Sequence, residues 1–175
     1  MKNQFFKALS ISCSLLFFTI GCAFAQTEPL GGWFAHNFTD PVTGAKTLAI
    51  NALSNEGRAP NGDPFLLVIR CSGGVPDVFI DWRDPLTTTD DGESAMVAYK
   101  FDDSQPQTNL WNTSGNYSAT FVSDNVPDFI RQLSSSQEFA AEVVDFEGNQ
   151  DAAVFDLGGI SKVLPPIEAA CGITQ

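Results

Sequence analysis

The sequence contains only one histidine, and its other residues of catalytic types do not stand at recognisable catalytic spacings. Its one histidine, His36, lies in a strand-like run. A histidine serves hydrolysis when it adjoins an activated nucleophile, and the G-x-S-x-G turn that presents such a serine is absent. We therefore interpret His36 as an ordinary strand residue. A small hydrolase that pairs His36 with a serine or an aspartate is the least favoured alternative.

Acidic residues are clustered at several points, as they are in calcium sites and glycosidase pairs. The clusters are Asp81 with Asp84, Asp90 with Asp91 and Glu93, and Asp102 with Asp103. None follows the D-x-[DN]-x-[DN]-G spacing of a calcium loop, and a glycosidase needs a larger sugar cleft than this length allows. We interpret these carboxylates as solvated loop residues, and the sequence predicts no catalytic residue, no metal site and no cofactor.

Residues 1–25 have the pattern of a secretory signal peptide. Two lysines precede an apolar run at 11–20, and Ala23-Phe24-Ala25 before Gln26 has the A-x-A form of a cleavage site. The apolar run is too short for a comfortable membrane span. The sequence therefore predicts one secreted or periplasmic domain over 26–175, with no integral membrane segment after cleavage. In the alternative, Cys22 after Gly21 is the lipidated residue of a lipoprotein signal.

The cysteines that remain after cleavage are Cys71 and Cys171, because Cys13 and Cys22 lie in the leader. Two cysteines in an exported domain most simply form one disulfide. Such a bridge closes a loop of about 100 residues and contributes roughly 4 to 5 kcal/mol in the chain-entropy model. The alternative is a reactive thiol, which usually has a C-x-x-C spacing or an electropositive setting. Only the adjacent Arg70 supports that alternative.

The composition is that of a folded domain with an acidic surface. Hydrophobic residues make up 43% of the 175-residue chain and charged residues 17%, and the formal net charge is −12. Removal of the leader, which carries Lys2 and Lys7 and no acidic residue, changes this charge to −14. Such a surface repels phosphate backbones and anionic lipid headgroups, which argues against nucleic-acid binding.

The hydrophobic pattern predicts a β-rich domain. Alternating runs indicate strands at 33–38, 46–51, 65–71, 78–82, 95–102, 117–122, 139–146 and 152–157. Helical spacing indicates one short helix over 126–133 and another over 160–171, which begins or kinks at Pro165-Pro166. Residues 103–109 have the composition of a loop. The predicted fold is mostly β (α+β), an antiparallel β-sandwich-like domain with two short helices and one disulfide.

Five large aromatic residues could form a binding platform or pack in the core. They are Trp33, Trp82, Trp111, Tyr99 and Tyr117. Core packing is the usual fate of such side chains. Trp111 is the best candidate for an exposed binding residue, because it lies in the polar stretch 107–118.

Six short motifs follow one another along the chain: LVIRC (67–71), VAYKFD (97–102), WNTS (111–114), FIRQL (129–133), AVFDLGG (153–159) and AACG (169–172). Their order and spacing resemble those of the VasI-like accessory proteins associated with bacterial type VI secretion. The resemblance implies an exported envelope protein with an accessory role, a protein partner in the envelope and no known reaction. The alternative is a free-standing periplasmic ligand-binding or inhibitor domain unrelated to secretion.

Overall fold

The computed structural model describes residues 31–174 and is mostly antiparallel β-sheet. The strands are β1 (Trp33–Thr39), β2 (Lys46–Leu53), β3 (Leu66–Ser72), β4 (Val75–Asp81), β5 (Ser94–Phe101), β6 (Gln107–Thr113), β7 (Ala119–Phe121), β8 (Glu138–Val144) and β9 (Gln150–Asp156). The helices are α1 (Val126–Ser135), α2 (Ile160–Val163) and α3 (Pro165–Cys171). The predicted fold class is confirmed, with three short helices in place of two. The predicted signal peptide at 1–25, its cleavage site and the alternative lipidated Cys22 lie outside the described residues.

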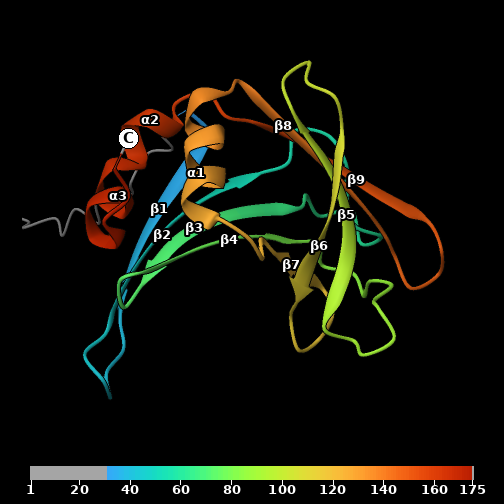
Figure 1. Ribbon diagram of the computed structural model, residues 1–175, viewed down its shortest axis with the longest axis horizontal. Coiled ribbons are helices and arrows are strands. Elements are labelled where there is room, and N and C mark those ends of the chain that lie inside the picture. The colour runs from blue at the N-terminus through green and yellow to red at the C-terminus, as the bar shows by residue number, and fades with distance from the viewer. Residues whose placement is uncertain (1–30, 175) are drawn as a thin grey trace, which may run out of the picture.

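All nine strands belong to one strongly curved sheet with the order β1-β2-β3-β4-β7-β6-β5-β8-β9. The three helices gather on one side of the curve (Figure 1). The sheet does not close, since β1 and β9 remain its two edges. The sandwich-like character arises because the inner faces of both halves of the sheet line one hydrophobic core. Among the described residues, no helix is long and apolar enough to cross a membrane.

Alternation along each strand separates an inner, buried face of the sheet from an outer face. In β3, Leu67, Ile69 and Cys71 are buried on the inner face, whereas the side chain of Arg70 lies on the outer face. This period of two is what the pleat of a strand imposes on a half-buried sheet. The helices cover only the inner face, so within residues 31–174 no helix covers the outer face of the sheet (Figure 1).

The helix α1 fills the hollow of the sheet with an aromatic side chain. Its Phe129 ring lies 5.3 to 5.6 Å, between centroids, from the rings of Tyr99, Phe101, Trp111 and Phe139. Most of these contacts are edge-to-face, the arrangement that aromatic quadrupoles favour. Because the four rings belong to β5, β6 and β8, α1 holds this half of the sheet together.

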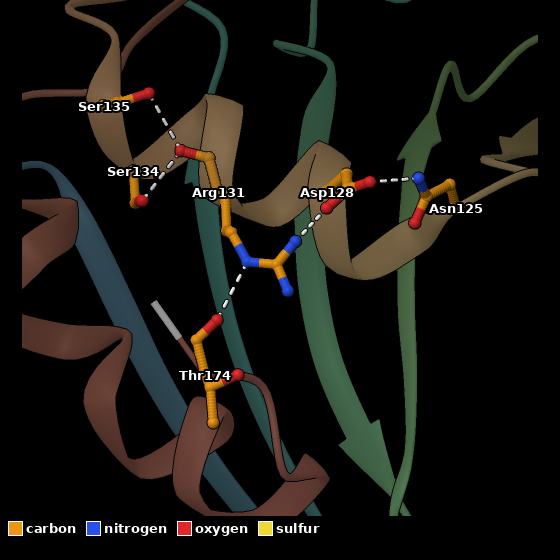
Figure 2. A network of polar contacts seen from close by, with 6 residues as sticks. All are labelled: Asn125, Asp128, Arg131, Ser134, Ser135 and Thr174. Atoms are coloured by element: carbon orange, nitrogen blue, oxygen red, sulfur yellow. Dashed lines mark hydrogen bonds and ion pairs between the residues drawn. The ribbon is translucent and has the colours of Figure 1, made fainter.

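The C-terminal segment is fastened to the sheet and to α1. The predicted disulfide is confirmed: Cys71 in β3 and Cys171 in α3 are bonded, with their Cα atoms 5.8 Å apart. Arg131 in α1 pairs with Asp128 and donates from Nε to the carbonyl oxygen of Thr174 at 2.9 Å (Figure 2). The predicted tail helix is two helices, because Pro165 cannot continue α2 and begins α3 instead.

One strand, β6, was predicted as loop and polar chain. Its residues Gln107, Thr108 and Asn112 are polar and exposed, and a polar run lacks the hydrophobic alternation that identifies a strand. The strand forms because β5 pairs with residues 107–112 on one side and β7 pairs with Asn112 and Thr113 on the other, and this backbone pairing does not depend on the side chains. Here tertiary pairing overrides local propensity.

Candidate functional site

Trp111, the one binding residue that the sequence suggested, is buried. Its side chain is only 1% exposed, and its ring lies 5.6 Å from Tyr99 and 5.4 Å from Phe129 between centroids. The indole has room on the inner face because its cross-strand neighbour is the small Ala95. The expectation that Trp111 forms a surface platform is therefore wrong, and the polar residues around it are those that face solvent.

Core packing, the preferred interpretation, is confirmed for three of the other four aromatic candidates and not for Tyr117. Trp33 and Trp82 are buried, and the indole N–H of Trp82 donates to the hydroxyl of Thr120 at 3.0 Å. Tyr99 is also buried, whereas Tyr117 is 45% exposed. Burial of a tryptophan with its N–H paired is typical of core packing. His36 lies exposed on β1, and within residues 31–174 its imidazole makes no hydrogen bond.

The outer face of β3, β4 and β7 carries a group of side chains that we call the outer aromatic patch: Val68, Arg70, Asp77, Phe79 and Phe121. The register places them side by side, with Val68 opposite Phe79, Arg70 opposite Asp77 and Phe79 opposite Phe121. The tight turn at 73–74, where both glycines have positive φ, sets this register. The patch is therefore a direct product of the β3–β4 hairpin.

Arg70 is the polar centre of the outer aromatic patch. Its Nη2 and Nε atoms both donate to Oδ2 of Asp77, at 2.6 and 3.0 Å. Its guanidinium carbon lies 5.0 Å from the ring centroid of Phe79 and 5.9 Å from that of Phe121, and these two rings stack at 4.8 Å. The side chain of Arg70 remains 38% exposed. Among the described residues its Nη1 atom has no partner, so it can donate to a carbonyl or carboxylate of another molecule.

Two further features extend over the outer face of the other half of the sheet. Met96 and Leu110 are opposite each other on β5 and β6 and are 65% and 50% exposed. Beyond them is a shallow hollow of about 290 Å³. Its floor is formed by three alanines on neighbouring strands, Ala98, Ala140 and Ala152, and both Lys100 and Glu142 line it. The hollow exists because the short alanine side chains project less far from the sheet than the longer side chains around them.

Three carboxylates from distant parts of the sequence meet at one end of the sheet. Oxygen atoms of Asp84, Asp145 and Asp151 all lie within 4.8 Å of one another. The segment after Asp84 pairs with the end of β8, where the amide of Thr87 donates to the carbonyl of Val144 at 2.9 Å. Only Asp84 belongs to a cluster that the sequence suggested. The others were missed because they lie at the ends of the β8–β9 hairpin, with no motif spacing.

The three carboxylates differ in their electrostatic setting. Asp145 accepts from the amide and side chain of Asn149 at 2.7 and 2.8 Å, and the side-chain bond to Asn149 is the main reason that its pKa is lowered. Burial raises the pKa of Asp151, and the neighbouring charges of Asp145 and Asp84 add to the effect. Oδ2 of Asp151 is buried without a partner among the described residues. Three such oxygen donors could hold a hard cation or share a proton.

Comparison with known proteins identifies a solved structure with a similar fold and gives no information about function. No protein-family model matches the chain, and no curated protein sequence matches it. Among solved structures, the fold is similar to that of the invasion-associated protein B from Bartonella henselae, with a TM-score of 0.53. The match covers 81% of this chain and 95% of the other, at 9% sequence identity. At that identity the likeness concerns the fold alone.

Proposed function

We propose that the chain is an exported, non-enzymatic accessory protein of the bacterial cell envelope that binds a protein partner through its outer aromatic patch. The disulfide supports export, because such bonds persist in oxidising compartments. The periplasmic location and the accessory role rest on the leader pattern and on the resemblance to VasI-like proteins.

The observation that carries this proposal is the exposed Arg70 packed against Phe79 and Phe121. Arginine and aromatic side chains are enriched at the positions that dominate the binding energy of protein interfaces. The stacked rings hold the guanidinium in place, so little side-chain freedom is lost when it binds a carbonyl or carboxylate. The inner face offers no comparable surface, because the helices and the aromatic core occupy it.

In-cell crosslinking with a tagged copy in the native host tests the proposal. The tagged protein, its Arg70→Ala and Phe79→Ala variants and the control Lys100→Ala are crosslinked, purified and analysed by mass spectrometry. We expect one envelope protein to be recovered repeatedly with the unchanged chain and with Lys100→Ala, and to be lost with the two patch variants. Thermal unfolding of each variant confirms that the fold is retained.

Two results would contradict this function. Recovery of the bare chain, at good expression and crosslinking yield, would argue against an envelope partner. Equal recovery of the same protein with all four chains would place the binding surface elsewhere. The alternative of a free-standing ligand-binding domain is favoured by the alanine-lined hollow, whose volume of about 290 Å³ is close to that of small-molecule sites. A small molecule that protects the protein thermally, and no longer does so in Ala140→Leu, would support that alternative.

A further inference from the structure

Within residues 31–174, the edge strand β1 has no backbone partner on its outer side along its whole length. All seven of its residues pair with β2 on one side, from Trp33 opposite Ala52 to Thr39 opposite Lys46. On the other side, no backbone group of β1 is hydrogen-bonded to any described residue. Every residue from 34 to 39 is exposed, so over these six residues neither face of the strand is buried by the described part of the chain. Such an edge presents a row of free N–H and C=O groups to another strand.

The opposite edge, β9, is covered. The amide of Asn55 donates to the carbonyl of Val154 at 2.7 Å, and the amide of Val154 donates to the carbonyl of Glu56 at 3.2 Å. The side chain of Asn55 also accepts from the amide of Asp156 at 2.7 Å. Gly57 allows this approach, since a Cβ there would lie 1.8 Å from the carbonyl oxygen of Ala152. The chain therefore protects one edge of its sheet with a loop and leaves the other open.

The sequence of β1 has none of the devices that keep edge strands from pairing. Natural edges are usually blunted by lysine, by proline, by other charges or by bulges. The strand WFAHNFT contains no acidic residue, lysine, arginine or proline, although the whole chain has a net charge of −12. Its outer face carries Phe34 and Phe38, which are 36% and 60% exposed. An acidic protein thus has an uncharged, aromatic, unpaired strand at one edge.

The strand is complementary to itself. Two copies of β1 can pair antiparallel about a two-fold axis at His36. All seven residues of one copy then lie opposite a residue of the other copy, and the two side chains of each pair are on the same face of the sheet. Phe34 of each copy then lies opposite Phe38 of the other, which forms two aromatic cross-strand pairs on either side of the two His36 residues. The charged residues at the end of the strand, Asp40 and Lys46, are roughly 25 Å or more from their counterparts in the other copy, because they lie at opposite ends of the ladder.

We propose that β1 pairs antiparallel with β1 of a second copy of this chain, so that two nine-stranded sheets become one continuous sheet with two-fold symmetry. A single pair of strands buries less surface than a standard interface, so the dimer forms with a Kd in the micromolar range. Screening of the like net charges strengthens it, and raising the salt concentration lowers the Kd. The dimer is independent of the outer aromatic patch, since β1 contributes none of the patch residues.

Sedimentation of the purified, oxidised protein over a range of concentrations tests the association. We expect the mean mass to rise from that of one chain towards that of two. In Phe34→Lys/Phe38→Lys, like charges face each other in both cross-strand pairs, and the Kd rises by about tenfold or more. In Phe34→Lys/Phe38→Glu the facing charges are opposite, and dimerisation recovers relative to the double-lysine variant. Val42→Lys, at a side chain that is 90% exposed in the β1–β2 turn, is the matched control and leaves the Kd unchanged.

Disulfide trapping tests the register and keeps the proposal falsifiable. In His36→Cys the two introduced thiols face each other at the two-fold axis, and mild oxidation yields a covalent dimer. In Thr39→Cys the thiols lie at opposite ends of the ladder, and no such dimer forms. Equal trapping of both variants, or a protein that stays monomeric at every concentration with no trapping of His36→Cys, overturns the proposal. Trapping of His36→Cys in cells with a different protein, while the purified chain stays monomeric, assigns the edge to that protein and also overturns it.

Discussion

The two halves of the sheet are stabilised in different ways. The half built from β1 to β4 is fastened by a covalent bond from Cys71 to Cys171, which ties β3 to the end of the chain. The half built from β5, β6, β8 and β9 has no such bond and depends on the Phe129 ring among four other aromatic rings. The N-terminal half is therefore stabilised by a covalent bond between residues 100 apart in sequence, and the C-terminal half is stabilised by side-chain packing.

The same contrast extends to the surface. The N-terminal half carries all of the outer aromatic patch except Phe121 and ends in the edge strand β1, whereas the C-terminal half carries the alanine-lined hollow and ends in β9, whose edge is bonded to a loop at Val154 and Asp156. The half with the covalent fastening is thus the one that carries Arg70 of the outer aromatic patch and the edge strand β1. A surface that binds other chains benefits from a rigid base, because less conformational freedom is then lost on binding.

Loss of the disulfide is expected to have the largest effect on stability. In Cys71→Ala/Cys171→Ala, the free energy of unfolding falls by about 4 kcal/mol, because the unfolded chain is no longer closed into a loop of 100 residues. Chemical denaturation of the oxidised protein, the variant and the reduced protein measures this. The reduced protein should match the variant, and an unchanged denaturation midpoint after reduction would contradict the assigned role of the bond.

The same experiment tests whether the halves are energetically separate. Since α1 packs against both β4 and the aromatic residues of β5, β6 and β8, we expect one cooperative transition with and without the bond. Tryptophan fluorescence and circular dichroism should then give the same midpoint. Two separated transitions in the reduced protein would show that the bond, and not the shared core, couples the halves.

Removal of the Phe129 ring is the corresponding change in the C-terminal half. Phe129→Ala leaves a cavity among Tyr99, Trp111 and Phe139 and should lower the free energy of unfolding by about 3 to 4 kcal/mol. Phe146→Ala, at a ring that is 80% exposed, is the control and should change it by less than about 0.5 kcal/mol. Similar losses in both variants would mean that α1 does not organise this half.

The smallest effect on the free energy of unfolding is expected from a substitution among the three neighbouring carboxylates Asp84, Asp145 and Asp151, and this effect depends on pH. Burial and the charges of Asp145 and Asp84 raise the pKa of Asp151 above its usual value of 3.8, so its ionised form is disfavoured in the folded state. Asp151→Asn should therefore stabilise the protein at neutral pH by about 0.5 to 1 kcal/mol. The gain should disappear below pH 3.8, where the carboxyl is protonated in both states.

Denaturation of Asp151→Asn at pH 3.5, 5 and 7 checks this dependence, with the exposed Asp103→Asn as the control. A stabilisation that is the same at all three pH values would assign the effect to packing and not to the charge. A destabilisation at pH 7 would mean that ionised Asp151 is favoured in the folded protein, for example by a bound cation.

Much of the fold follows from local pattern. Alternation located eight of the nine strands, and the spacing of Phe129, Ile130 and Leu133 located α1. The candidate site was far less accessible to prediction. Arg70 was noted only as a neighbour of Cys71, since its stacking on Phe79 and Phe121 depends on the register of two strands and on a third that follows much later. A register is decided by pairing between strands, and no single segment encodes it.

By itself, the sequence determined eight of the nine strands and which two cysteines can bond, because side-chain period and cysteine count are local or countable properties. Only the tertiary structure decided that polar β6 is a strand, that Trp111 is buried, that Asp84, Asp145 and Asp151 meet, and that β1 is an open edge while β9 is covered. These outcomes depend on which strands become neighbours. Strand pairing is decided by burial and hydrogen bonding across the whole chain. The segments that a strand pairs with therefore influence its structure more than its own sequence does.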